Sequence, residues 1–166
     1  NILGKNSISE NSKILGSLIN QSVKKRLVSD VPIGCFLSGG IDSSLVASYM
    51  QKNSTNKIET FSIGQSDKKY DELSYARKIS KILGTNHNEY LISNNEILDT
   101  IENINHVYSE PFADSSQIPS ILLSERVKKK VTVALTGDGG DELFGGYNRY
   151  LYSKQVLKFM KVIPYR

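Results

Sequence analysis

Two glycine-rich segments hold most of the residues in this 166-residue chain that are suited to chemistry. The first, SGGIDSS at residues 38–44, follows an apolar run, and the second, TGDGGDELFGGYNRY at residues 136–150, follows the run VTVALT. Glycines let backbone N–H groups approach an anion closely, and serine hydroxyls add further donors. The first segment therefore has the composition of a phosphate-binding loop, although GxxxxGK[ST] occurs nowhere and the loop is not of the Walker type.

Asp42 is an unexpected residue in such a loop, because its carboxylate repels phosphate unless a cation lies between them. Mg²⁺ is the obvious cation, since it binds through one or two carboxylates together with substrate phosphates. The second segment adds Asp138, Asp141 and Glu142, and we expect Asp42 and Asp141 to share one Mg²⁺ if their strands are neighbours. The alternative is that Asp42 only caps a helix, and that the second segment is a glycine turn before a helix with acids in its first turn.

The elements that must position these segments follow from the apolar pattern along the chain. Strands are predicted over residues 31–37, 58–63, 87–92 and 131–136, and helices over residues 10–28, 45–50, 73–83, 97–107, 151–163 and from residue 118 onward. Gly84 sits where a C-terminal helix cap belongs, and Pro119 is tolerable only in a first turn. This alternation predicts an α/β fold with an open parallel sheet and helices on both faces, and such sheets bind ligands beyond the carboxyl ends of their strands.

Composition and charge exclude several classes of protein. The net charge is only +4, and the one tight basic run, Lys128 to Lys130, has no interleaved aromatic residues, so a helix end is favoured over a nucleic-acid site. A single cysteine, Cys35, excludes a disulfide framework. No apolar stretch approaches the roughly 18 residues of a membrane span. We expect a cytoplasmic protein that uses neither membrane nor nucleic acid.

The two glycine-rich segments also carry a family resemblance. SGGIDSS resembles the pyrophosphate loop of the ATP pyrophosphatases, and SDVPIGCFLSGGIDSSLVA with LTGDGGDELFGGYNRY resembles the synthetase domain of glutamine-dependent asparagine synthetases. The stretches FSIG at 61–64, YDELSYARKISKILGTNH at 70–87 and SEPFADSSQIPS at 109–120 extend the resemblance over nearly the whole chain from about residue 12. It implies a fold like that of the adenine nucleotide alpha hydrolases.

The resemblance implies an activity with ATP and Mg²⁺ as cofactors. Members of the family adenylate the side-chain carboxylate of aspartate, pyrophosphate leaves, and ammonia from a glutaminase domain attacks the β-aspartyl-AMP to give asparagine. Two alternatives stay open: a related adenylating amidotransferase that acts on another carboxylate, such as a sugar acid or a secondary-metabolite precursor, and a non-catalytic ATP-binding module. A homodimer is compatible with this assignment for the full-length protein.

The resemblance also implies roles for individual residues, which fall into four sets. Those expected to hold the pyrophosphate are Ser38, Gly39, Gly40, Asp42 and Ser43. Those that match positions around the adenosine are Leu37, Ile63, Thr136 and Gly137. The expected Mg²⁺ ligands are Asp42 and Asp141. Asp138 is the catalytic candidate, because it takes a position where well-known members carry a glutamate tied to adenylate formation.

Two departures from the family pattern bear on domain organisation. The glutaminase domain has an N-terminal catalytic cysteine, whereas Cys35 lies inside a predicted strand. The family's essential lysine lies well downstream of the second segment, and Lys154, Lys158 and Lys161 come too early to match it. We therefore expect residues 1–166 to form one partial synthetase domain, without the glutaminase domain and the C-terminal part, that binds ATP but does not make asparagine.

Overall fold

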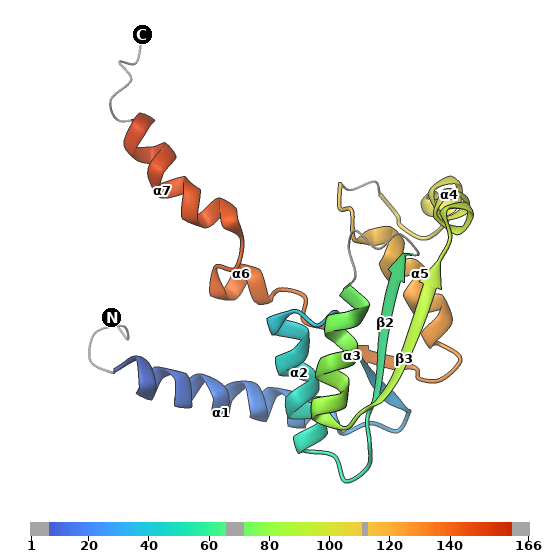
Figure 1. The fold of residues 1–166 in the computed structure, drawn as a ribbon, viewed down its shortest axis with the longest axis horizontal. Coiled ribbons are helices and arrows are strands. Elements are labelled where there is room, and N and C mark those ends of the chain that lie inside the picture. The colour runs from blue at the N-terminus through green and yellow to red at the C-terminus, as the bar shows by residue number, and fades with distance from the viewer. Residues whose placement is uncertain (1–6, 66–71, 111–112, 161–166) are drawn as a thin grey trace.

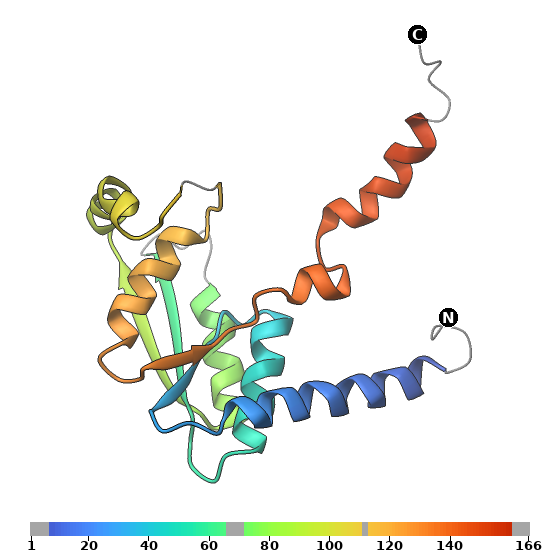
Figure 2. The ribbon, with the colours of Figure 1, turned by 180° about the vertical axis from the view of Figure 1, so that it is seen from behind.

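A four-stranded parallel sheet forms the centre of the computed structural model, which describes residues 7–65, 72–110 and 113–160. The strands are β1 (Ile33–Phe36), β2 (Glu59–Gln65), β3 (Asn86–Ile92) and β4 (Val133–Leu135). Their order is β3-β2-β1-β4, and all three neighbouring pairs are parallel. The chain builds outward from β1 to β3 and then places β4, in orange, on the free side of the blue β1 (Figures 1 and 2). The strand order thus reverses between β1 and β4, where α/β sheets bind ligands.

Helices cover both faces of the sheet, which confirms the predicted fold class (Figures 1 and 2). They are α1 (Ile8–Arg26), α2 (Ile41–Lys52), α3 (Glu72–Leu83), α4 (Asn94–Asn103), α5 (Gln117–Val127), α6 (Gly140–Phe144) and α7 (Asn148–Met160), with a short 3-10 helix, η2 (Ile104–His106). The helices α2 and α3 pack on one face and α5 packs on the other, with α4 against α5.

The alternation of side chains along β1 divides the core into two clusters. Cys35 and the adjoining Leu37 point toward α1, α2 and α3, where they pack with Met50 and other buried side chains. Phe36 points the other way and joins the cluster that Phe61 forms with α5. A sheet that is buried on both faces reads as a continuous apolar run rather than an alternating one, as the sequence around β1 does.

Several element boundaries differ from those predicted by apolar periodicity. The helices α1 and α4 begin two to three residues earlier than predicted, because Ser7 with Glu10 and Ser93 with Glu96 form capping boxes. The predicted positions of Gly84, with φ 72°, and of Pro119 in the first turn of α5 are confirmed. Parts of the predicted helix over residues 151–163 and of the stretches 70–87 and 109–120 lie outside the described residues. These parts are residues 70, 71, 111, 112 and 161–163.

The chain around β4 departs most from expectation. The predicted strand over residues 131–136 is wrong in extent, since only Val133–Leu135 pairs with β1. The partner strand is itself only four residues long, and Val131 is instead buried beside α5. The glycine-rich segment also contains an unpredicted helix, α6, which lies between Gly139 and Gly145, both with positive φ.

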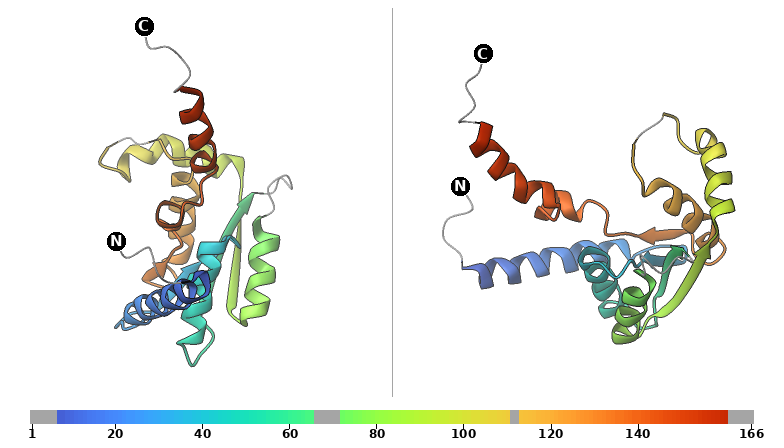
Figure 3. Two further views of the ribbon diagram at one scale, coloured as in Figure 1. Left: turned by 90° about the vertical axis from the view of Figure 1, so that its left-hand side faces the viewer. Right: turned by 45° about the horizontal axis from the view of Figure 1, so that its top comes forward.

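Two helices extend away from the sheet (Figure 3). The C-terminal part of α1 packs on α2 and joins the core through Val23, whereas Ile14 and Leu18, nearer its N-terminus, are about half exposed. The apolar side chains of α1 therefore lie in two environments, one buried and one exposed. Within the part of the chain that the structure describes, no helix is long and apolar enough to cross a membrane.

Candidate functional site

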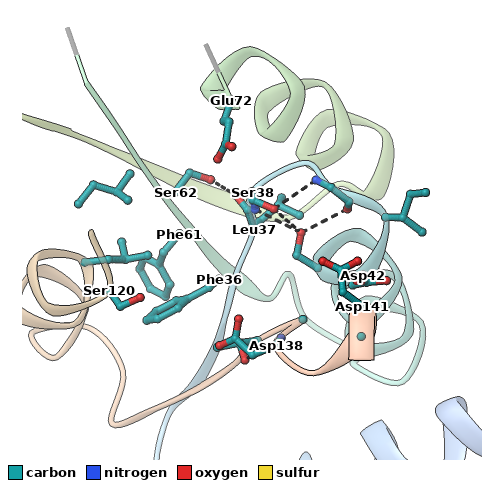
Figure 4. A pocket seen from close by; sticks show the side chains of 18 of the residues that line it. Phe36, Leu37, Ser38, Asp42, Phe61, Ser62, Glu72, Ser120, Asp138 and Asp141 are labelled. Carbon is teal, nitrogen blue, oxygen red and sulfur yellow. Dashed lines mark hydrogen bonds between the residues drawn. The ribbon is translucent and has the colours of Figure 1, made fainter. Parts of the chain in front are cut away.

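The loops that follow β1 and β4 are walls of one cavity of about 630 Å³ at the carboxyl edge of the sheet (Figure 4). The cavity size is within the range of small-molecule sites. The residues selected from the sequence that line it are Leu37, Ser38, Gly40, Asp42, Ser43, Ile63, Thr136, Gly137, Asp138 and Asp141. Gly39 is the selected residue that does not line the cavity.

Gly39 instead lets the first loop pass close to α3. Its φ is +83°, and a Cβ at this position would lie 2.6 Å from the backbone nitrogen of Ala76 and 2.6 Å from the Cβ of Tyr75. Only glycine fits both the left-handed conformation and this close approach. The requirement for glycine at this position is therefore structural, and a direct contact with pyrophosphate stays a prediction.

Serine hydroxyls hold the first loop in shape. The buried Ser43 hydroxyl accepts a hydrogen bond from the Ser38 backbone N–H at 3.3 Å and donates to the Gly40 carbonyl at 3.3 Å. It also lies 3.0 Å from the Ser38 hydroxyl. Ser43 thus fixes the loop from inside, whereas the exposed Ser38 remains open to a ligand in the cavity.

The first turn of α2 is open to an anion. Gly40 is the N-cap residue, and no side chain caps the helix. The backbone N–H groups of a first turn have no partner within the helix, and the helix dipole makes them attractive to negative charge. The interpretation of Asp42 as a helix cap is wrong, because Asp42 is the second residue of α2 and its side chain makes no cap hydrogen bond.

The second loop touches Asp42 directly. A Cβ on Gly140 would lie 2.4 Å from the Cγ and Oδ2 atoms of Asp42, and a Cβ on Gly137 would lie 2.6 Å from the Ser43 backbone nitrogen. The loops therefore meet because β1 and β4 are neighbours and glycine occupies both contact positions. Asp141 follows Gly140 and also lines the cavity, so the tertiary structure places both predicted metal ligands in one site.

The oxygen donors in this site suit Mg²⁺. Asp42 and Asp141 are half-buried carboxylates, the ligand type that Mg²⁺ prefers, and Mg²⁺ completes its coordination with phosphates and water. The described residues contain no group of three or more His, Cys, Asp or Glu side chains arranged to hold a metal without such help. Two carboxylates that line one cavity with the open first turn of α2 fit a metal that arrives with phosphates.

Asp138 lies at the exposed turn of the second loop. Its backbone N–H donates to the Thr136 hydroxyl at 3.3 Å, and its side chain lines the cavity (Figure 4). Farther along, the Tyr147 hydroxyl donates to Glu142 at 2.6 Å, and the Arg149 guanidinium lies 4.1 Å from the Tyr147 ring centroid. The Glu142 carboxylate raises the pKa of Tyr147 to about 12. The contacts of Tyr147 connect α6 to the start of α7. They do not involve Asp138, whose side chain has no hydrogen-bond or ion-pair partner among the described residues.

The remaining wall of the cavity was not selected from the sequence. It includes the apolar Phe36, Phe61 and Leu123 and the polar Ser62, Glu72 and Ser120. The buried Ser62 hydroxyl donates to the Leu37 carbonyl and so holds β2 to the end of β1. A buried serine within the apolar run of β2 was one available signal, since a polar side chain in a core needs a partner.

Comparisons with known proteins bear on the family of this chain. The model of the asparagine synthase family matches residues 15–164. A putative glutamine-hydrolysing asparagine synthetase 2 of Methanocaldococcus jannaschii is 40% identical over 153 residues, which cover 88% of this chain and 30% of that protein. The glutamine-hydrolysing asparagine synthetase 1 of Bacillus subtilis is 41% identical over 144 residues, which cover 87% of this chain and 23% of that protein. The chain thus spans less than a third of the length of these relatives.

Solved structures with little sequence similarity share the fold. The NH3-dependent NAD synthetase of Campylobacter jejuni superposes with a TM-score of 0.55 at 17% identity, covering 82% of this chain and 60% of that one. NMN synthetase of Francisella tularensis gives a TM-score of 0.54 at 16% identity, covering 88% and 61%. At this identity the likeness concerns the fold alone, and it confirms the predicted fold class.

Proposed function

Because the chain belongs to the asparagine synthase family, we propose that it binds ATP with Mg²⁺ in the cavity between β1 and β4 and activates a carboxylate for amide formation. Aspartate is the proposed acceptor, and ammonia the proposed nucleophile. The names of the relatives support this assignment, since those described above are glutamine-hydrolysing asparagine synthetases. The ammonia would come from glutamine hydrolysed in a glutaminase domain.

The contact between the two loops is the observation that carries the proposal. The Asp42 carboxylate fits against the second loop only because residue 140 is glycine. A Cβ at this position would lie 2.4 Å from the Asp42 Oδ2 atom. If Asp42 served only to cap α2, neither this close approach nor a second acidic loop would be needed. The arrangement supports a metal-phosphate site, because a carboxylate beside a phosphate is tolerated only when a cation lies between them.

In the proposed reaction a carboxylate oxygen of aspartate attacks the α-phosphorus of ATP, and the bond from that phosphorus to the α,β-bridging oxygen breaks. Pyrophosphate leaves toward the first turn of α2, whose N–H groups stabilise its charge. Ammonia then attacks the acyl carbon, AMP departs, and one proton is released. Asp42 and Asp141 would hold Mg²⁺, which would neutralise charge on the phosphates. Asp138 is proposed to orient the acceptor side of the site.

Magnesium-dependent ATP binding tests the proposal. Asp42→Asn should weaken binding of ATP in the presence of Mg²⁺ by about 10- to 100-fold or more, as losses at metal sites typically do, and should change metal-free ATP binding little. Isothermal titration with and without Mg²⁺ measures both. Asp99→Asn, an exposed change of the same chemistry on α4, is the matched control. Equal effects of Asp42→Asn on the two titrations would reject the metal role.

A second assay addresses the acceptor. Pyrophosphate release by the full-length protein should require aspartate and should be retained with ammonium in place of glutamine. Release that depends on another carboxylate and ignores aspartate would reject the proposed acceptor while leaving the nucleotide site intact.

A further inference from the structure

One carboxylate in the cavity takes no part in the chemistry proposed above. Glu72 is the first residue of α3 and lines the cavity beside β2. Figure 4 shows it near Ser62, on the other side of the cavity from Asp42 and Asp141. Its side chain is exposed, and no hydrogen-bond or ion-pair partner for it is found within residues 7–65, 72–110 and 113–160.

Glu72 is separate from the proposed metal site. The described side chains form no cluster of three acids that could hold an ion, so Glu72 does not complete a site with Asp42 and Asp141. A carboxylate without a cation repels phosphates. It is an acceptor only, and a nucleotide bound beside it must therefore present a hydrogen-bond donor.

The shape of the cavity indicates which part of the nucleotide reaches Glu72. If, as proposed above, the phosphates lie at the first turn of α2 between β1 and β4, the rest of the nucleotide extends along the cavity toward β2. This path passes the partly exposed ring of Phe36, behind which Phe61 and Leu123 are buried, and such an apolar wall suits a purine ring. At β2 the cavity meets a mostly apolar recess of about 270 Å³, and Ile63 and Glu72 line both spaces.

We propose that Glu72 accepts a hydrogen bond from the exocyclic amino group of adenine and selects ATP over purine nucleotides that carry an oxygen at this position. The inference rests on the proposed nucleotide site. Adenine has a donor at its 6-position, where guanine has an acceptor, and two acceptors repel each other. The same repulsion applies to the hypoxanthine base of ITP, which has the oxygen but not the additional amino group of guanine.

Exchange of the carboxylate for an amide tests this role. The wild-type protein should bind ATP about 10- to 100-fold more tightly than ITP, since hydrogen bonds to charged groups contribute about 1.5–3 kcal/mol. Glu72→Gln keeps the length of the side chain but can donate as well as accept, so ATP binding should weaken, ITP binding should strengthen, and the ratio should approach one. Glu102→Gln, an exposed change on α4, should keep the wild-type ratio, and thermal melts should match for all three proteins.

The outcomes separate this inference from the function on which it rests. An ATP-to-ITP ratio that Glu72→Gln leaves unchanged overturns the role of Glu72. A change in the preference for ATP over 2′-deoxy-ATP, with the ITP ratio unchanged, places Glu72 at the ribose and also overturns the assignment to the base. Failure of the wild-type protein to bind Mg·ATP removes the proposed nucleotide site itself, whereas normal ATP binding with no discrimination against ITP removes only the role of Glu72.

Discussion

Replacing Gly140 with alanine should disable the site without unfolding the protein. The new Cβ would lie 2.4 Å from the Asp42 Oδ2 atom, while ordinary contacts begin at 3.4 Å, so the Asp42 carboxylate must move by about 1 Å. A displacement of about 1 Å in a positioned group typically costs roughly 10²-fold in rate. We therefore expect Gly140→Ala to lower pyrophosphate release by the full-length protein by about 10²-fold and to weaken Mg·ATP binding.

The stability of the Gly140 variant should change little. Gly140 is the first residue of α6 and has no positive φ, and alanine is favoured over glycine in a helix by roughly 0.5–1 kcal/mol. The displaced Asp42 side chain is only half-buried, so the cost of moving it is smaller than that of overpacking a closed core. The net change in the free energy of unfolding should stay within about 1 kcal/mol.

Gly139→Ala is the matched control, because it should lower the stability of the protein and leave its affinity for Mg·ATP unchanged. Gly139 has φ +85°, and nothing lies within 4 Å of an added Cβ. Alanine there should cost about 1–2 kcal/mol of stability through the left-handed conformation, but it should not push Asp42. Thermal melts and isothermal titration with Mg·ATP measure the two properties. Wild-type affinity in Gly140→Ala, or an equal loss of affinity in a normally stable Gly139→Ala, would refute the argument.

Two further predictions concern the core and the far edge of the sheet. Cys35 has no exposed surface, and burial raises the pKa of its thiol to about 12. Alkylating reagents should therefore modify Cys35 only as fast as the protein opens. Rapid labelling of the native protein would contradict this prediction. Burial lowers the pKa of His87 below its ordinary 6.5, with Glu89 opposing the shift and Arg77 adding to it. The free energy of unfolding should therefore fall by up to about 1.4 kcal/mol per pH unit as the pH drops below 6.5, because the unfolded chain binds the proton more readily. Chemical denaturation between pH 7.5 and 5.5 should show a shallower dependence for His87→Asn, which can keep the hydrogen bond to Thr60, and equal slopes would argue against the role of His87.

Local chemistry in the sequence determined much of the fold. The apolar run around β1 and the periodic helices after it predicted the alternation of strands and helices, and glycine and proline fixed the ends of two helices at Gly84 and Pro119. The early starts of α1 and α4 were also present in the sequence as Ser-x-x-Glu patterns, which apolar periodicity overlooks. The extent of β4 was not predictable, since a strand ends where its partner ends.

The site divides in the same way. The sequence by itself determined that two loops of glycines, serines and acids follow strands, because those residue types have few other uses at such density. Only the tertiary structure decided that the loops touch, since strand order is set by long-range packing and not by the residues of either loop. The tertiary structure also decided that Gly39 lies against α3, that Ser43 accepts a hydrogen bond within the loop, and that Glu72 lines the cavity. Each of these contacts depends on which element lies opposite the residue.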